Sequence, residues 1–203
     1  MKSLISINLI LMFYICVSFS LKSIDVPRDS AEHIVKLSDS TGSGTGFYVM
    51  YKGKSYLISN NHVCGDAIGL NTKDGYRKVI ALSTEHDLCL LESTRETGLQ
   101  IGIGELNSLD EVHVVGHPLG NPLTAREGRF IGIEHEVLRH VSPYPVDIIT
   151  VSVAVFGGNS GSPLLNKYGK VVGVIFAMNQ RTAEDSYAVP REALIRFLET
   201  HHI

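Results

Sequence analysis

The chain has 203 residues, of which 44% are hydrophobic and 19% charged, a composition typical of folded globular proteins and not of disordered ones. The 18 Lys and Arg residues against 21 Asp and Glu residues give a formal net charge of −3. Because no stripe of basic residues runs along the chain, we expect no nucleic-acid partner.

The first 20 residues form a candidate secretory signal peptide. Lys2 precedes an uncharged apolar run over residues 4–21, and Ser18-Phe19-Ser20 places small residues at the −3 and −1 positions of a cleavage site. The run also reaches the lower length limit for a membrane anchor, although its polar residues weaken that alternative. Cleavage predicts a secreted or periplasmic protein with residues 21–32 as an N-terminal segment, and an uncleaved run would add contact with a membrane.

Short apolar, β-branched or aromatic runs predict a chain built mainly from strands, because Gly, Asp, Asn and Lys clusters separate them. The first set lies at residues 47–51, 55–58, 78–82 and 88–91, and the second at residues 112–115, 130–133, 148–153 and 171–175. Regular short strands of this kind are typical of β-barrels or a β-sandwich.

A polar, glycine-containing stretch over residues 92–110 separates the two sets of strands. We therefore predict one half over about residues 33–100 and another over about 110–189. After Pro190, the spacing of Leu194, Phe197 and Leu198 predicts a helix over residues 190–199, which leaves residues 200–203 as a tail.

The segment Gly158-Asn159-Ser160-Gly161-Ser162-Pro163 places a serine in a turn of small residues. Glycines adopt backbone conformations that side chains forbid, so such a turn can present backbone N–H groups beside an exposed hydroxyl. Acyl transfer needs a nucleophile next to donors that stabilise an oxyanion. Ser160 is therefore a candidate nucleophile, provided that a base activates it.

Two upstream residues supply a candidate base and a group to orient it. His62 follows an apolar run that breaks into polar residues, and Asp87 stands at the start of the apolar run 88–91. His86 is a rival base, but neighbours on a strand point to opposite faces, so we expect it to face away from Asp87. The chain order His62, Asp87, Ser160 is that of double β-barrel proteases.

Six collinear segments resemble one protease family. They are residues 44–47, 57–63, 86–91, 115–120, 158–163 and 169–174. Together they identify the chain as similar to the trypsin-like (chymotrypsin-fold) serine proteases of bacterial type, such as the Deg proteases and the glutamyl endopeptidases. The resemblance covers about residues 33–199 and matches a protease domain alone.

The resemblance implies an all-β fold of two six-stranded antiparallel β-barrels with the active site in the cleft between them, and a short C-terminal helix. It implies a serine endopeptidase that acts on protein or peptide substrates without a cofactor. The backbone of Gly158, Asn159 and Ser160 would form the oxyanion hole. The substrate pocket would be bounded by Ala154, Val155, Phe156, Ile175, Phe176 and Ala177, and because no charge lies in these segments we expect a small or aliphatic preference.

Departures from the family pattern lie beside the nucleophile. Ser162 stands where many trypsin-like proteases have glycine. The glutamyl endopeptidases resemble this chain at that position. Asn159 replaces the aspartate that pairs with a freed N-terminus in digestive enzymes of the family, so we predict no activation by that ion pair. Ile175 stands where the glutamyl endopeptidases place a histidine, which argues against selection for Glu.

Two other functions are consistent with parts of the sequence. One is a catalytically inactive relative that serves as a binding module. The other is an esterase that uses Ser160 with Asp185 and His201 or His202, but Ser162 stands where the esterase turn requires glycine.

The remaining histidines and cysteines carry weaker signals. His113 and His117 cannot share a helix face because Gly116 and Pro118 intervene, and the triplet at 134–136 is typical of a solvated strand or loop, so we expect no metal site. Cys64 and Cys89 each lie two positions beyond a candidate catalytic residue. They either form a disulfide or remain buried free thiols, and the strict geometry of a disulfide favours the thiols.

Overall fold

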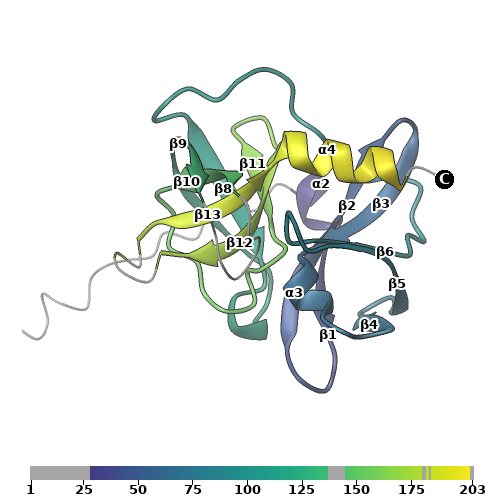
Figure 1. Cartoon of the computed structure of the whole chain (residues 1–203). Helices are drawn as coiled ribbons and strands as arrows, with labels where there is room; N and C mark the ends of the chain where they lie inside the picture. Colours follow the sequence, from purple (N-terminus) through teal and green to yellow (C-terminus); the bar gives the residue numbers. More distant parts are fainter. Residues whose placement is uncertain (1–27, 137–144, 180–181, 183, 202–203) are drawn as a thin grey trace, which may run out of the picture.

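The computed structural model describes residues 28–136, 145–179, 182 and 184–201. These residues form two β-barrels side by side, with a helix across one end (Figure 1). The signal-peptide prediction and most of the segment 21–32 lie outside the described residues.

Barrel one is built from the N-terminal half of the chain. Its strands are β1 (Ile34–Ser38), β2 (Ser43–Tyr51), β3 (Lys54–Ser59), β4 (Gly69–Thr72), β5 (Gly75–Ser83) and β6 (Leu88–Leu91). They are hydrogen bonded in the order β1-β4-β5-β6-β3-β2, and antiparallel pairing of β2 with β1 closes the ring. A short seventh strand, β7 (Leu99–Gln100), adds to β2 in parallel.

Barrel two is a closed ring of six antiparallel strands. Its members are β8 (Glu111–Gly116), β9 (Thr124–Glu136), β10 (Val146–Val151), β11 (Pro163–Asn166), β12 (Val171–Met178) and β13 (Ser186–Pro190). The order around the ring is β10-β13-β12-β11-β8-β9. The predicted fold class, two six-stranded antiparallel β-barrels with a short C-terminal helix, is therefore confirmed, and the β-sandwich is excluded.

The stretch that separates the two sets of strands contacts both barrels. After β7, Gly102 donates its backbone N–H to the carbonyl oxygen of Val171 on β12 (2.8 Å). A hydrophobic cluster also crosses the junction, since it includes Ile58 of barrel one and Val115 and Val174 of barrel two. Closely packed apolar side chains resist sliding, so this shared core fixes the barrels relative to one another.

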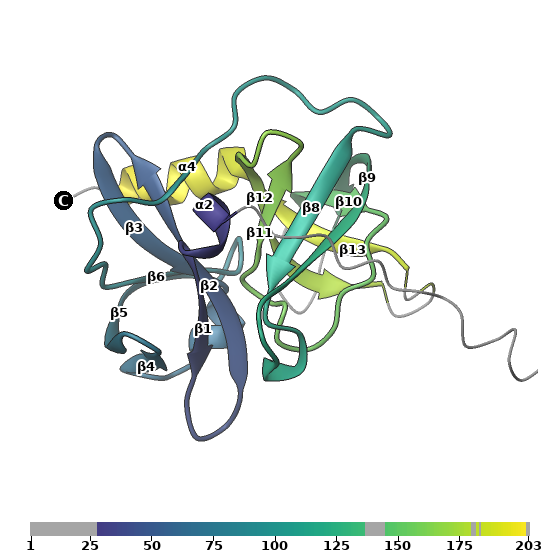
Figure 2. The same cartoon turned by 180° about the vertical axis from the view of Figure 1, so that it is seen from behind.

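Short helices complete the fold: α2 (Arg28–Ala31), α3 (Asn61–Cys64), the 3₁₀ turn η1 (Pro118–Gly120) and α4 (Arg191–Thr200). Helix α4 leaves barrel two and runs over barrel one in both views (Figure 1 and Figure 2). It buries Leu194, Phe197 and Leu198, the residues whose spacing predicted a helix. Near its end, Tyr51 on β2 donates its hydroxyl to Glu199 (2.7 Å).

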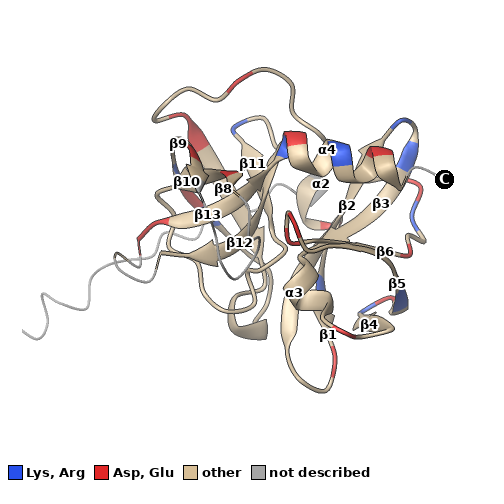
Figure 3. Cartoon of the chain, viewed as in Figure 1, with Lys and Arg blue, Asp and Glu red and all other residues tan. Residues whose placement is uncertain are grey.

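Charged residues are dispersed over both barrels and α4 (Figure 3). Within the described ranges, no helix is long and apolar enough to cross a membrane. The C-terminal tail begins later than predicted, because α4 extends to Thr200 and the ring of His201 packs edge-on against Phe197 at 4.9 Å.

Candidate active site

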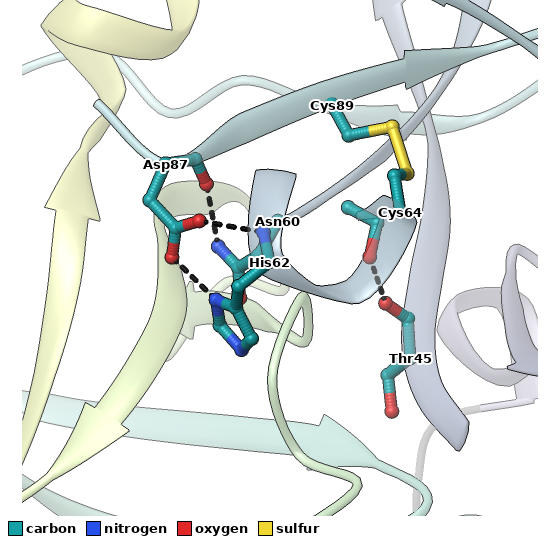
Figure 4. Close-up of a disulfide and its surroundings, with 7 residues drawn as sticks. Thr45, Asn60, His62, Cys64, Asp87 and Cys89 are labelled. Atoms are coloured by element: carbon teal, nitrogen blue, oxygen red, sulfur yellow. Dashed lines mark hydrogen bonds and ion pairs between the residues drawn. A yellow bond between two sulfur atoms is a disulfide. The ribbon is translucent and has the colours of Figure 1, made fainter. Parts of the chain in front are cut away.

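His62 on α3 and Asp87, which directly precedes β6, lie against one another (Figure 4). The imidazole Nδ1 lies 2.7 Å from Oδ2 of Asp87, and the backbone N–H of His62 donates to Oδ1 at 2.9 Å. The carboxylate is buried (5% exposed), whereas the imidazole is half exposed (48%). Because the buried carboxylate of Asp87 accepts a hydrogen bond from Nδ1, the imidazole carries its proton on Nδ1. Nε2 is then free to accept another proton.

Local structure explains how these two residues are presented. Strand β3 ends at Ser59, and the chain turns into α3, whose second residue is His62. The side-chain amide of the fully buried Asn60 donates to the backbone carbonyl of Asp87 (2.9 Å). Asp87 itself has a positive φ of 50°, a left-handed conformation that aspartate tolerates better than most residues and that sequence reasoning did not predict.

The two cysteines form a disulfide, so the expectation of free thiols was wrong. The bond joins Cys64 at the end of α3 to Cys89 on β6, across 25 positions of sequence, with a Cα–Cα distance of 6.5 Å (Figure 4). Folding brings the two Cα atoms within the range that a disulfide spans, a fact that sequence spacing does not reveal. The bond ties the helix that carries His62 to the strand that follows Asp87.

Ser160 lies in the second of two consecutive turns, which span residues 156–159 and 159–162. The backbone N–H of Asn159 donates to the carbonyl of Phe156 (3.0 Å), and the N–H of Ser162 donates to the carbonyl of Asn159 (2.9 Å). Gly158 and Gly161 have φ values of 90° and 83°, which residues with a Cβ rarely adopt. A Cβ on Gly158 would also overlap the carbonyl oxygen of His117.

Three carbonyl groups before Ser160 are each held by a hydrogen bond. Leu119 N–H donates to Gly157 O (2.5 Å), the Thr45 hydroxyl donates to Gly158 O (2.7 Å), and Ser162 N–H holds Asn159 O. In a trans peptide group the C=O and N–H point in opposite directions, so fixing each carbonyl also fixes the N–H that follows it.

Two of the predicted oxyanion donors remain available. In the part of the chain that the structure describes, the N–H groups of Gly158 and Ser160 donate to no other protein group, whereas that of Asn159 is used inside the turn. Asn159 therefore shapes the turn and does not act as a donor. Thr45, which is fully buried, also accepts the N–H of His117 (3.0 Å), and sequence reasoning missed it.

His62 and Ser160 line the same cavity, which has a volume of about 180 Å³ and lies at the junction of the barrels. Across the described residues, no hydrogen bond joins the Ser160 hydroxyl to the imidazole. Catalytic hydrogen bonds are often long without substrate and shorten when it binds.

The other histidines have partners elsewhere. His86 lies 3.7 Å from Glu85, His113 lies 3.5 Å from Glu111, and Nδ1 of His117 bonds the carbonyl of Asn121 (3.0 Å). Burial lowers the pKa of His86 and of His117 below the ordinary value of 6.5.

His135 lies on β9, exposed as predicted, and contacts Asp147 at 2.9 Å. Among the residues placed here, no three His, Cys, Asp or Glu side chains gather into a metal site.

The predicted substrate pocket is only partly accessible. Val155 and Ile175 pack in the core of barrel two (4% and 0% exposed), so they can support such a pocket only from beneath. Phe156 is 39% exposed, and the guanidinium of Arg126 lies 4.6 Å from its ring centre. Arg126 also donates to the carbonyl of Ala154 (3.3 Å), so a cation from β9 borders segments that contain no charged residue of their own.

The model of the trypsin-like peptidase domain matches residues 44–174, and the chain therefore belongs to that family. It is similar to the serine protease Do-like HtrA of Bacillus subtilis (strain 168), with 32% identity over 153 residues that cover 68% of this chain and 34% of the relative. It is also similar to a serine protease HtrA-like of Staphylococcus aureus (strain bovine RF122 / ET3-1), with 29% identity over 88% of this chain and 25% of the relative. The chain thus spans about a third and a quarter, respectively, of the length of these relatives.

Solved structures show the same fold. The active form of the Rv3671c protease from M. tuberculosis superposes with a TM-score of 0.72 at 21% identity, over 84% of this chain and 81% of that one. The HtrA-type protease AlgW with a tripeptide gives a TM-score of 0.71 at 21% identity, over 84% of this chain and 60% of the other.

Proposed function

We propose that this protein is a serine endopeptidase that cleaves peptide bonds through an acyl-enzyme intermediate. The observation that supports this most is the His62–Asp87 pair, whose imidazole lines one cavity with Ser160. Membership of the trypsin-like peptidase family supports the same reaction class.

In the first half of the reaction, Ser160 Oγ attacks the carbonyl carbon of the scissile bond and His62 Nε2 accepts its proton. Asp87 holds the Nδ1 proton and stabilises the imidazolium that forms. The N–H groups of Gly158 and Ser160 bind the developing oxyanion. His62 then gives the proton to the leaving amine, and the C–N bond breaks to leave the acyl group on Ser160.

In the second half, water attacks the acyl group. His62 accepts a proton from this water and returns one to Ser160 as the acid leaves. Every proton transfer uses a side chain of this chain, so the scheme calls for no cofactor.

We also propose that the pocket beside Phe156 selects small or aliphatic residues on the acyl side. Arg126 strengthens the argument against Lys and Arg there, because a second cation beside its guanidinium would be repelled. Digestion of a peptide library would test this preference, and dominant cleavage after Glu or Arg would contradict it.

Because Asn159 has no charge, we further propose that the enzyme needs no ion pair with a freed N-terminus. Deleting residues 21–32 should leave activity within a few-fold of the parent. A gain of orders of magnitude on deletion would contradict this.

We propose that the protein is exported to the periplasm or the medium. The candidate signal peptide supports this, and so does the Cys64–Cys89 bond, since disulfides persist mainly in oxidising compartments. The mass of the protein isolated from producing cells should correspond to a chain that begins at Leu21, and an intact N-terminus would favour an anchor.

A fluorophosphonate probe tests the reaction class, because it labels only an activated serine. We expect labelling of the parent protein and none of Ser160→Ala or His62→Ala. His86→Gln is the matched control, since His86 adjoins Asp87 in sequence but contacts Glu85. Labelling that survives in Ser160→Ala would contradict the assignment of the nucleophile.

The same probe separates an enzyme from an inactive binding module, which would remain unlabelled. Comparison of casein with a short-chain ester separates a peptidase from an esterase. Two observations already weigh against the esterase: its proposed Asp185 contacts Thr182, and His201 packs on Phe197.

A further inference from the structure

The cavity beside the candidate catalytic residues has an apolar floor and a polar rim. The partly exposed Val63 of α3 forms the floor, and the buried Leu37 of β1 and Leu70 of β4 lie beneath it. The rim is the end of β1 at Ser38 and the loop between β1 and β2, which includes Asp39 and projects from the lower end of barrel one (Figure 1 and Figure 2). Among the described residues that line the cavity, Ser160 alone belongs to barrel two, so the lining comes almost entirely from barrel one.

This location assigns the cavity to the leaving-group side of the scissile bond. The acyl side follows the segments of barrel two around Phe156, whereas the cavity is walled by His62. Since His62 must protonate the leaving amine, the residues that follow the scissile bond lie against the imidazole. The side chain of one of them would extend into this cavity.

The rim carries one carboxylate, which is hydrogen bonded within its own loop. Oδ1 of Asp39 accepts hydrogen bonds from the N–H and hydroxyl of Thr41 (2.7 Å each) and from the N–H of Gly42 (2.9 Å). These bonds, first that from the Thr41 hydroxyl, lower the pKa of Asp39, so the group stays charged at neutral pH. Of the described residues that line the cavity, Asp39 is the sole carboxylate and no Lys or Arg joins it.

The nearest basic residue along β1 does not neutralise Asp39. Lys36 precedes Leu37, whose side chain is buried in the core of barrel one, so Lys36 projects from the opposite, outer face of the strand. Its ammonium group donates to the carbonyl of Gly120 at 2.9 Å. The remaining titratable group in the cavity is His62, which the mechanism requires to be neutral before attack.

We propose that this cavity is a subsite for a Lys or Arg side chain located one or two residues after the scissile bond. The aliphatic stem packs on the partly exposed Val63, and the cationic group reaches Asp39, as long basic side chains bury their stems and expose their charges. The inference rests on the proposed peptidase function and specifies which peptides the site prefers.

Internally quenched peptides test the subsite. A series should share one acyl-side sequence and carry Arg, Lys, Leu or Glu at the first or second position after the scissile bond. We expect kcat/KM to be about two- to fivefold higher for Arg and Lys than for Leu, and lowest for Glu, because the ion pair is exposed. About 1 M salt should reduce the preference.

Asp39→Asn isolates the charge, because the amide oxygen can still accept the three hydrogen bonds of the loop. We expect the ratio of Arg to Leu rates to fall toward one in this variant. Asp66→Asn is the matched control: Asp66 is an exposed acid near the end of α3, outside the cavity lining, and its loss should leave the ratio unchanged. An Asp39→Asn variant that keeps the parental ratio would overturn the proposal.

A peptidyl anilide, whose leaving group has no amino-acid side chain, separates the two levels of inference. If Ser160 is required for anilide hydrolysis but Arg and Leu peptides are cleaved equally, the subsite is wrong and the peptidase function stands. If neither the anilide nor any peptide is cleaved, the peptidase function is wrong and the subsite is wrong with it.

Discussion

Barrel one holds His62 and Asp87 with side-chain hydrogen bonds and a disulfide, whereas barrel two holds Ser160 with backbone hydrogen bonds and two glycines. The His62–Asp87 pair is complete within barrel one, and its contacts come from α3 and the start of β6. The Ser160 turn is not complete within barrel two, because Thr45 crosses from barrel one to hold Gly158. The His62–Asp87 pair is thus built by one barrel, whereas the turn that carries Ser160 depends on how the two barrels are joined.

Asp87→Asn should have the largest effect, because it removes the group that sets the imidazole tautomer in barrel one. Asparagine tolerates the positive φ at this position, so the fold should persist. We expect kcat to fall about 10⁴-fold, as for the equivalent change in a well-studied triad. Peptidase kinetics beside a circular dichroism spectrum would check this, and a loss below tenfold would show that His62 needs no such partner.

Removal of the disulfide asks whether barrel one depends on its covalent link. We expect Cys64→Ser with Cys89→Ser to lower the free energy of unfolding by about 3 kcal/mol, since the bond closes a loop of 25 positions. Urea unfolding of the double variant and of the parent, both in oxidising buffer, measures the difference. Equal stabilities would mean that packing alone holds α3 against β6.

Thr45→Val tests whether barrel one controls the oxyanion turn of barrel two. The change keeps the shape but leaves the carbonyl of Gly158 and the N–H of His117 without a buried partner, at a cost of about 1–3 kcal/mol. We expect kcat to fall about 10- to 100-fold with little change in KM, because the oxyanion forms only in the transition state.

Thr45→Ser is the control, since it retains the hydroxyl and should recover most of the activity. If the valine and serine variants lose activity equally, the hydroxyl does not position the turn. A loss confined to stability in both variants would also count against the role.

The smallest effect concerns His117, beside the Ser160 turn. Burial lowers its pKa below 6.5, outweighing the bond to Asn121, which raises it, and the charges of Lys36 and Lys73 lower it further. The unfolded chain therefore binds a proton at His117 more tightly than the folded protein does. As a result, neutral His117 contributes its full stabilisation above pH 6.5, and this stabilisation is lost as the pH falls through the folded-state pKa. Urea unfolding from pH 7.5 to 5 should show a shallower decline in His117→Asn, and an unchanged slope would contradict the assignment.

Local sequence patterns predicted eight of the thirteen strands that the structure describes, and the C-terminal helix, but not β1, β4, β7, β11 or β13. Apolar and β-branched runs predicted the strands around His62 and Asp87, because such residues favour a buried sheet. Pro190 and the spacing of Leu194, Phe197 and Leu198 predicted α4 for the same kind of reason. The glycines around Ser160 predicted a tight turn because only glycine adopts the required backbone conformation at low cost.

Only the tertiary structure decided which distant groups meet. The disulfide, the bond from Thr45 to Gly158 and the contact of Arg126 with Phe156 each join segments that lie 25 to 113 residues apart in the sequence. Such contacts depend on barrel closure and on the angle between the barrels, which summed packing sets and no short stretch of residues encodes.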